Sequence, residues 1–455
     1  MTQSYDILVI GGGPAGYAAA LEAAALGKST ALVEKKLLGG TCLNWGCIPT
    51  KLFLGATSPI IAMAAQSRLR LGQGSFTVDM AALQKRKMSL LAATRQSMAK
   101  TLEAAGVRLI AGKAELCGPT QVLIHTADAS ELRIDFQRLI LALGSSPAWP
   151  KHLAPDGEGV LNSDHALDMA TIPESLAVIG AGAIGVEMAQ FYQRMGASVT
   201  LIEAADRIAP SEDPEICAQL ASILKRQGVR TRTGVAVTAL ERANGQVIVH
   251  LDENPDGGLI VDKVLVAVGR RPNSHLSGLE LAGISPEDGT LRTDANLMLG
   301  DRIAAVGDCN GQNLLAHAAE DQGRFAARHA AGVVSGPYTP GAVPFCIYGD
   351  PEVFRVGPTI QEARSQGMVC TESKAHLAAN PVAQAAAAPH GLVKVLWSGE
   401  TVIGISAVGH GVLHLVTTAT IMVNQGWTRE QAESLIFAHP TLDESLRQAL
   451  LADAT

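Results

Sequence analysis

Short apolar runs that end in a glycine turn occur twice in the first half of the chain. The runs Tyr5–Ile10 and Leu176–Ile179 are short and uninterrupted, and turn residues bound them, which is typical of strands. Each leads through a glycine turn into a stretch of helical composition. A second apolar run, Ser29–Val33 or Ser198–Ile202, then completes the unit. The order strand, turn, helix, strand predicts an α/β fold that contains one module twice.

Further apolar runs predict how the rest of the chain is organised. Short strands are expected from about Gly106 to Ser146, at Lys263–Val268, which closes the second module, and at residues 301–308. From about Val343 the pattern changes to strands at Leu392–Trp397 and Val402–Ala407, with helices after Gly411. This change predicts a separate C-terminal α+β domain. The Ala- and Pro-rich stretch Ala375–Pro389 is expected to be a surface connection.

Composition narrows the class of protein. The chain has 455 residues, of which 47% are hydrophobic and 17% charged, and a formal net charge of -7. This apolar content excludes a disordered chain. The acidic balance and the lack of a Lys/Arg block argue against a nucleic-acid or membrane partner, as does the lack of an apolar run of about 18 residues. The first residues show no targeting pattern, so we expect a cytoplasmic location.

The glycine turns carry the spacing of a dinucleotide-binding site. The glycines are Gly11, Gly13 and Gly16 in the first module and Gly180, Gly182 and Gly185 in the second. Glu34 and Glu203 end the second strand of each module, both 23 positions after the first glycine. One such motif is a weak signal, but two copies with the same acid spacing are a strong one.

The physical role of each part is specific. The glycines allow a tight turn, close approach of a pyrophosphate and close packing of helix on strand. The helix N-terminus offers free N–H groups to the phosphates, and the acid accepts from ribose hydroxyls. Two modules imply two nucleotides, most simply FAD and NAD. A carboxylate at Glu203 repels a 2′-phosphate and favours NAD over NADP. Arg207 lies four residues further on, and we give its opposing effect little weight.

The segment Gly39–Lys51 carries two cysteines, Cys42 and Cys47. Five residues of regular helix would separate their Cα atoms by about 7.5 Å, beyond the roughly 4.4–6.8 Å of a disulfide. Gly46 and Pro49 permit a local distortion that brings them together. We favour a redox disulfide; a zinc half-site and two core cysteines are the alternatives. The other five cysteines are isolated in sequence and are expected to pack.

Together these motifs resemble the class I pyridine nucleotide–disulfide oxidoreductases, and within them the dihydrolipoamide dehydrogenases. The similar segments include both glycine modules, the Cys-x4-Cys segment, Gly269-Arg270, Gly307-Asp308, Leu315-Ala316-His317 and His439-Pro440-Thr441. The resemblance implies two Rossmann-like domains, for FAD and NAD, and a C-terminal dimerisation domain. The implied boundaries are 1–150 (FAD, with the disulfide), 151–275 (NAD), 276–342 (completing the FAD site) and 343–455 (interface of a homodimer).

The resemblance also implies residue roles. Cys42 would exchange with substrate sulfur, Cys47 would stand against the flavin, and Lys51 would stabilise negative charge on it. His439, oriented by Glu444, would act as base and reach Cys42 of the other subunit. Cofactor contacts are expected from the glycines of both modules and from Glu34, Gly40, Thr41, Lys51, Ala114, Ser145, Ile184, Glu187, Glu203, Gly269, Asp308 and Ala316.

The leading hypothesis is oxidation of a dihydrolipoyl group on a carrier protein or multienzyme complex, with NAD as acceptor. Phe437 stands where lipoamide dehydrogenases usually carry a histidine, two residues before His439. This departure keeps a second hypothesis open, an NADH-dependent reductase of another disulfide, a polysulfide or a metal ion. A third is a flavoprotein subunit that binds within a larger complex without much catalysis.

Overall fold

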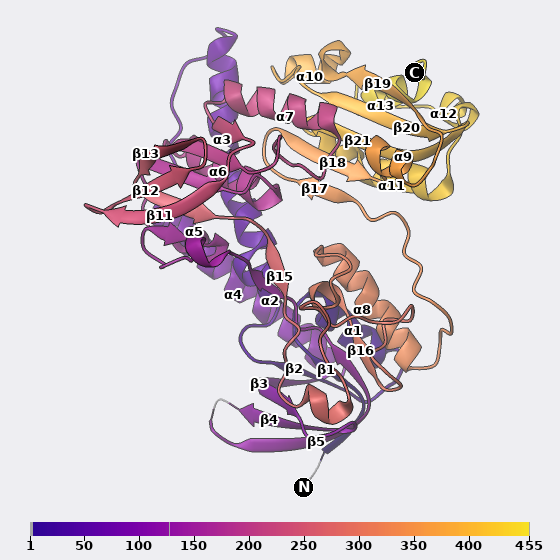
Figure 1. The fold of residues 1–455 in the computed structure, drawn as a ribbon. Coiled ribbons are helices and arrows are strands. Elements are labelled where there is room, and N and C mark those ends of the chain that lie inside the picture. Colours follow the sequence, from indigo (N-terminus) through magenta and orange to yellow (C-terminus); the bar gives the residue numbers. More distant parts are fainter. Residues whose placement is uncertain (1–2, 127, 455) are drawn as a thin grey trace. The chain divides into compact units, whose positions relative to one another are not determined.

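The computed structural model describes residues 3–126 and 128–454, which form two compact units (Figure 1). Residues 3–49, 85–148 and 270–340 make the first unit, and residues 50–84, 149–269 and 341–454 make the second. The first unit therefore contains most of the predicted segments 1–150 and 276–342, and the second unit contains most of the predicted segments 151–275 and 343–455. The bounds of the four predicted segments stay predictions.

The first unit is built on a parallel sheet with the strand order β3–β2–β1–β5–β16. These strands are Arg108–Leu116, Thr30–Glu34, Gln3–Ile10, Glu131–Leu141 and Ile303–Ala305. The C-terminal half of β3 and the N-terminal half of β5 each pair antiparallel with β4 (Gln121–Thr126). Separately, β6 (Ser145–Pro147) pairs antiparallel with β15 (Arg270–Pro272). The helices are α1 (Pro14–Ala25), α2 (Gly40–Trp45), α8 (Ala316–Ala330) and most of α4 (Met80–Ala104).

Two glycines let elements of this unit approach more closely than any other residue would. A Cβ at Gly16 would lie 1.8 Å from the carbonyl oxygen of Gly11, so the glycine turn closes directly on α1. A Cβ at Gly323 would lie 2.2 Å from the carbonyl oxygen of Ala15, which brings α8 against α1. The start of α1 is thereby fixed at the carboxyl edge of the parallel sheet.

The second unit repeats the parallel arrangement in the order β10–β9–β8–β14–β7. These strands are Arg230–Thr233, Ser198–Glu203, Ser175–Ile179, Lys263–Val266 and Val160–Leu161. An antiparallel sheet, β11 (Val237–Ala243), β12 (Gln246–Leu251) and β13 (Asn254–Val261), shares an apolar core with it. The helices are α5 (Ser163–Asp168), α6 (Ala183–Arg194), α7 (Pro214–Arg226) and most of α3 (Cys47–Arg68).

The C-terminal part of the second unit is an antiparallel sheet in the order β17–β18–β21–β20–β19. These strands are Phe345–Ile347, Glu352–Val356, Thr401–Gly409, Leu392–Ser398 and Thr371–His376. The helices are α9 (Ile360–Ser365), α10 (Pro381–Ala385), α11 (Val416–Gln425), α12 (Arg429–Ser434) and α13 (Asp443–Leu451). Trp397 lies in the core and its indole N–H donates to the Ser373 hydroxyl, at 2.7 Å.

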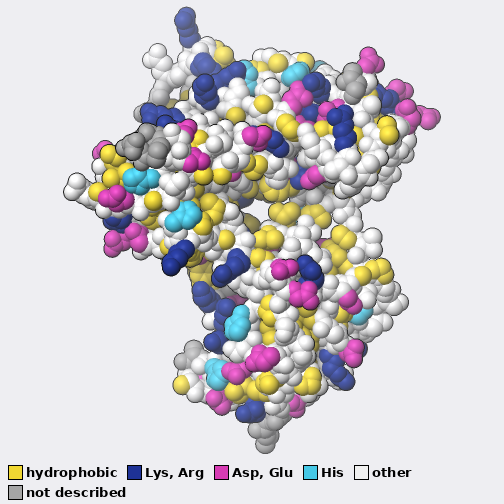
Figure 2. Space-filling model, viewed as in Figure 1, with side chains coloured by type: hydrophobic (Ala, Val, Ile, Leu, Met, Phe, Trp, Pro, Cys, Tyr) yellow, Lys and Arg dark blue, Asp and Glu magenta, His cyan; other side chains and the backbone are white. Residues whose placement is uncertain are grey.

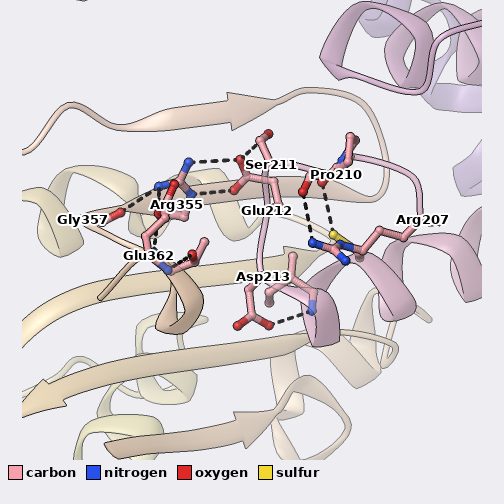
Figure 3. A network of polar contacts seen from close by, with 12 residues as sticks. Arg207, Pro210, Ser211, Glu212, Asp213, Arg355, Gly357 and Glu362 are labelled. Atoms are coloured by element: carbon pink, nitrogen blue, oxygen red, sulfur yellow. Dashed lines mark hydrogen bonds and ion pairs between the residues drawn. The ribbon is translucent and has the colours of Figure 1, made fainter. Parts of the chain in front are cut away.

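Ion pairs join this C-terminal part to the part of the same unit that holds the second glycine turn. The Arg355 Nε on β18 donates to Glu212, which stands just before α7, at 2.9 Å (Figure 3). Lys394 on β20 is 5% exposed and binds both carboxylate oxygens of Asp213, each at 2.9 Å. Because Asp213 also caps α7 through Glu215 N, the ion pairs set the position of this helix.

The structure corrects three expectations about the elements. Ala375–Pro389 is not a surface connection: it contains α10, and Leu377 and Asn380 are each 0% exposed. The strand expected at residues 301–308 ends at Ala305, because the chain turns at Gly307 with φ 70°. The strand expected to run to Val268 ends at Val266.

The distribution of surface charge and the apolar length of the helices both concern the kind of partner that the protein could bind. Acidic and basic side chains are mixed over the face shown in Figure 2. Among the described residues, one helical stretch, Gly40–Arg68, is long and apolar enough to cross a membrane. Core helices of soluble proteins meet the same criterion, and this stretch is interrupted at Gly46 and carries Lys51 in an ion pair with Glu187.

Candidate cofactor and thiol sites

The first glycine turn forms an open cradle in the first unit. Gly11 has φ 106°, and a Cβ there would lie 2.1 Å from the carbonyl oxygen of Ala142 on the neighbouring segment. Gly13 caps α1 without a side-chain hydrogen bond, which leaves the first N–H groups of the helix for an anion. The Glu34 carboxylate accepts from Gly12 N at 2.7 Å and from Lys36 N at 2.7 Å, so it is held at the edge of the cradle.

The second glycine turn repeats this geometry in the second unit. A Cβ at Gly180 would lie 2.4 Å from the Ala267 oxygen, and one at Gly185 would lie 1.9 Å from the Gly180 oxygen. A Cβ at Gly182 would meet no atom within 4 Å, so the space in front of α6 is open to a phosphate. The Glu203 carboxylate accepts from Ala181 N at 2.7 Å. Both cradles fit a dinucleotide pyrophosphate.

Arg207 is engaged within its own turn. Its guanidinium contacts Asp206 at 3.1 Å and donates to the carbonyl oxygen of Pro210 at 3.3 Å (Figure 3). The Glu203 carboxylate meanwhile lies at the end of β9, beside the glycine turn. This arrangement supports the expectation that Glu203, not Arg207, determines the choice between the two nicotinamide cofactors.

Asp308 lies at the same edge of the first sheet as the Gly11 turn. It follows β16 and accepts a hydrogen bond from the Ser145 hydroxyl. Arg270 donates to that hydroxyl at 2.7 Å and to the Ser145 carbonyl oxygen at 2.8 Å. Sequence reasoning named Ser145 and Asp308 separately, and the structure brings them together. A carboxylate at this edge is suited to bind hydroxyl groups of a cofactor chain.

Three other residues that the sequence predicts to contact a cofactor lie in different parts of the fold. Ala316 is the first residue of α8, and Gly269, with φ 133°, directly precedes β15. The Ala114 side chain is 3% exposed and packs in the apolar core of the first unit.

The helix that carries the cysteines is interrupted between them. Cys42 lies in α2, and α3 begins at Cys47. Gly46 between them has φ -144° and ψ -110°, and a Cβ there would lie 3.5 Å from the Cα of Cys42. The chain thus folds back at Gly46, the distortion that the sequence predicts. The pairing of the two sulfurs stays a prediction.

The start of α2 is fixed against the first glycine cradle. Gly40 has φ 56°, and a Cβ there would lie 2.7 Å from the Cα of Gly13. The Asn44 amide donates to the carbonyl oxygens of Leu38 and Gly40, and Arg95 on α4 donates to its oxygen at 2.8 Å. The cysteine segment is therefore held beside the place where the pyrophosphate would bind.

Lys51 and Glu187 form an ion pair in the second unit. Lys51 Nζ lies 2.9 Å from Glu187 Oε2, and Tyr348 N donates to Glu187 Oε1 at 3.0 Å. The Tyr348 ring lies below the ammonium, with 4.1 Å from Nζ to the ring centroid. Burial raises the pKa of the Glu187 carboxyl, and the Lys51 charge opposes that rise. Sequence reasoning missed Tyr348, because an isolated aromatic residue carries no motif.

His439 and Glu444 form the pair that the resemblance implies. His439 Nδ1 lies 3.0 Å from Glu444 Oε1, and Thr441 N donates to Glu444 Oε2 at 3.1 Å. The hydrogen bond with His439, and then that with Thr441 N, lower the pKa of the Glu444 carboxyl. The His439 side chain is 74% exposed. Because Nδ1 is engaged, proton exchange with a substrate falls to Nε2.

Comparison with known families decides the class. Residues 5–323 match the model of the pyridine nucleotide-disulphide oxidoreductases, and residues 343–450 match the dimerisation domain of the same proteins. The chain belongs to the pyridine nucleotide-disulphide oxidoreductase family. The predicted fold class, the enzyme class and the use of FAD and NAD are thereby confirmed. The dimerisation domain supports the predicted homodimer.

Individual relatives agree over the whole chain. Dihydrolipoyl dehydrogenase of Chlorobaculum tepidum is 32% identical over 99% of this chain and 97% of its own length. One from Bacillus subtilis is 34% identical over 98% of each. The crystal structure of LpdA from Mycobacterium tuberculosis has a TM-score of 0.89 at 27% identity, and covers 99% of each chain. The Cu(II) complex of the HOCl-induced flavoprotein disulfide reductase RclA from Escherichia coli has a TM-score of 0.87 at 26% sequence identity, and the match also covers 99% of each chain.

Proposed function

We propose that this enzyme oxidises a protein-bound dihydrolipoyl group to the lipoyl disulfide, with NAD as hydride acceptor. The observation that carries the proposal is the His439–Glu444 pair, with its ring nitrogen 3.0 Å from the carboxylate. A thiol with a pKa near 8.5 is mostly protonated at neutral pH and needs a base to become a nucleophile. Relatives named dihydrolipoyl dehydrogenase, 32% and 34% identical over nearly the whole chain, support the substrate.

The proposed reaction assigns one task to each side chain. His439 takes a proton from a substrate thiol, and Glu444 stabilises the resulting imidazolium. The substrate thiolate attacks Cys42, the Cys42–Cys47 bond breaks, and Cys47 leaves as thiolate. The second substrate thiol then attacks the mixed disulfide, which releases the cyclic lipoyl disulfide and reduced Cys42. FAD, when bound, would supply the two-electron chemistry that links the Cys42–Cys47 dithiol to NAD.

Lys51 and Glu203 have supporting tasks in this proposal. Lys51 stands one helical turn after Cys47 on α3, so the two side chains share a helix face. Its ammonium, held by Glu187, would stabilise negative charge that develops near Cys47. Glu203 would hold the ribose of NAD. We further propose a cytoplasmic location and a lipoyl-carrying protein as partner, both consistent with the reducing conditions that a reversible dithiol requires.

An anaerobic titration tests the proposal. Purified holoenzyme is titrated with a reduced lipoyl protein and, separately, with NADH. We expect each reductant to deliver two electrons per chain and to raise the thiol count of the denatured protein from five to all seven cysteines. Failure of the lipoyl protein to reduce the enzyme, while NADH succeeds, contradicts the substrate but leaves the chemical class intact.

A second candidate is an NADH-dependent reductase of a different disulfide, a polysulfide or a metal ion. Phe437 favours it, because this side chain packs against the core of the C-terminal sheet and supplies no second imidazole next to His439. The similarity to RclA, whose structure is a Cu(II) complex, is consistent with it. A panel of disulfides, polysulfide and Cu(II) with NADH separates the two candidates by their relative kcat/KM.

A further inference from the structure

Asn380 is a fully buried polar residue in the segment that the sequence predicts to be a surface connection. Its side chain is 0% exposed. The side-chain oxygen accepts from Val382 N at 2.9 Å and from Ala383 N at 3.2 Å, and so starts α10. The side-chain nitrogen donates to the carbonyl oxygen of Thr441, at 2.9 Å. One amide therefore joins a helix start to a residue 61 positions later in the chain.

Thr441 lies between His439 and Glu444. Its N–H donates to Glu444 Oε2 at 3.1 Å, and its hydroxyl donates to the Ala438 carbonyl oxygen at 2.8 Å. Glu444 in turn holds His439 Nδ1 at 3.0 Å. Three consecutive links, Asn380 to Thr441, Thr441 to Glu444 and Glu444 to His439, thus connect the buried core to an exposed imidazole.

The imidazole needs such an anchor because its own segment is irregular. Residues 435–442 lie between α12 and α13 and belong to neither helix. By contrast, Leu377 and Ala383, on either side of Asn380, are 0% and 2% exposed and belong to the same apolar core as Leu446 of α13. Fixing irregular backbone costs conformational entropy, which a buried hydrogen bond to the Thr441 carbonyl offsets.

We propose that Asn380 is a positioning residue for the His439–Glu444 pair, acting through the Thr441 carbonyl. This inference rests on the proposed function of that pair in dithiol oxidation. A pair that is misplaced by a fraction of an ångström loses turnover without losing substrate or cofactor binding. The role of Asn380 therefore lies in the geometry of proton transfer, and it is measurable separately from stability.

Two substitutions and one control isolate the link. Asn380→Asp keeps the oxygen that starts α10 and places a second acceptor against the Thr441 oxygen. Asn380→Ser keeps a hydroxyl that caps α10 and is too short to reach Thr441. The control is Gln384→Ala, because the Gln384 amide donates to Ala378 within the same segment, at 2.6 Å, and makes no part of the link.

The first readout is steady-state kinetics of the holoenzyme with dihydrolipoamide and NAD. We expect both Asn380 variants to lower kcat about ten- to a hundredfold, with little change in KM for NAD. Reduction of a dye by NADH, which requires no base for a thiol, stays within about twofold of wild type. Gln384→Ala stays within about twofold in both assays.

The second readout does not depend on the substrate. The rate at which diethyl pyrocarbonate modifies His439 is followed against pH by peptide mass spectrometry. We expect its midpoint to move by about half a pH unit or more in both Asn380 variants and to stay in place in Gln384→Ala. If wild type fails to oxidise lipoyl groups, the proposed function is rejected and this profile still decides the role of Asn380. Unchanged profiles in both Asn380 variants, or an equal shift in the control, overturn the inference.

Discussion

Glu444 is a carboxylate whose hydrogen bonds keep it ionised well below neutral pH. Hydrogen bonds from His439 and Thr441 N hold its pKa below the ordinary value of 4.5. A lowered carboxyl pKa means that the charged Glu444 carboxylate, with the stabilisation from its hydrogen bonds, is fully present above pH 4.5 and is lost only as pH falls through the lower, folded value. Glu444 therefore stays charged across the neutral range, and a fall of activity near pH 6 reports another group.

Glu444→Gln tests this charge. We expect kcat with dihydrolipoamide to fall by about tenfold or more, because the imidazolium loses its counter-charge. For the same reason the acid limb of the pH profile of kcat moves to lower pH. The control is Glu433→Gln, an exposed carboxylate on α12. An unchanged acid limb in Glu444→Gln would show that the carboxylate has no electrostatic role.

Cys42→Ser tests the thiol chemistry. We expect lipoyl turnover to fall by about a thousandfold or more, because a hydroxyl does not replace a thiolate as the exchanging group. Reduction of a dye by NADH persists, since the nucleotide cradles are untouched. The control is Cys370→Ser, a partly buried residue of the C-terminal part. Equal losses in both variants would assign the effect to folding.

At this scale the sequence names candidate residues, but it does not predict which of them contact one another. The resemblance names Lys51 and Glu187 in different regions, and their ion pair joins positions 136 residues apart. Tyr348 completes that pair through its ring and its N–H and has no sequence signal. Asn380 lies in a segment whose Ala and Pro content suggests solvent exposure, and the burial of its neighbours overrides that composition.

At the scale of the element, each glycine of a glycine turn is required for a different physical reason. In the second cradle, the Gly185 position is closed by the backbone of Gly180, whereas the Gly182 position is open. Close packing of α6 on β8 therefore depends on Gly185, and space for a pyrophosphate depends on Gly182. We therefore expect Gly185 to serve folding and Gly182 to serve cofactor binding, although both belong to one motif.

Gly182→Ala and Gly185→Ala separate these functions. Gly182 has φ -72°, which alanine adopts readily, so we expect normal stability and a rise of at least about tenfold in KM for NAD. In Gly185→Ala the Cβ would lie 1.9 Å from the Gly180 oxygen, so α6 must shift and the second unit loses stability. Thermal unfolding and NAD kinetics of both variants give the answer. A Gly182→Ala enzyme with unchanged KM for NAD would exclude this cradle as the pyrophosphate site.

Elements with a regular pattern are well predicted, and their ends are less so. The strand expected at Tyr5–Ile10 is observed as β1, Gln3–Ile10, because an apolar run bounded by a glycine turn has few alternative structures. The strand expected at residues 301–308 stops at Ala305, where the left-handed backbone of Gly307 directs Asp308 toward Ser145. Local pattern defines the element, while the site at its end defines where it stops.

At the scale of the whole second unit, a buried charge holds two parts together. Lys394 on β20 contacts Asp213, Glu215 and Glu372. Burial lowers the pKa of the Lys394 ammonium, but Glu372 and Asp213 together raise it above its ordinary value. The lysine is therefore charged, and its removal would leave a buried carboxylate, Asp213, without its cation.

Lys394→Met is expected to destabilise the second unit by about 3–5 kcal/mol. Lys374→Met is the control: Lys374 contacts the same Glu215 at 2.7 Å, but its side chain is 49% exposed. Loss of this exposed ion pair should lower the free energy of unfolding by only about 0–1 kcal/mol. Hydrogen exchange of the β19, β20 and β21 amides measures both. Equal protection in the two variants would show that the buried pair contributes no more than the surface pair.

The sequence by itself determined the two nucleotide modules, their carboxylates and the cysteine pair. Each of these depends on spacing within a few tens of residues, and such spacing converts directly into a turn, a helix start or a bent helix. Only the tertiary structure decided the pairs Lys51–Glu187, Asn380–Thr441 and Lys394–Asp213, whose members stand 136, 61 and 181 positions apart. A buried polar group must find a partner wherever the fold supplies one, and no local pattern records that choice.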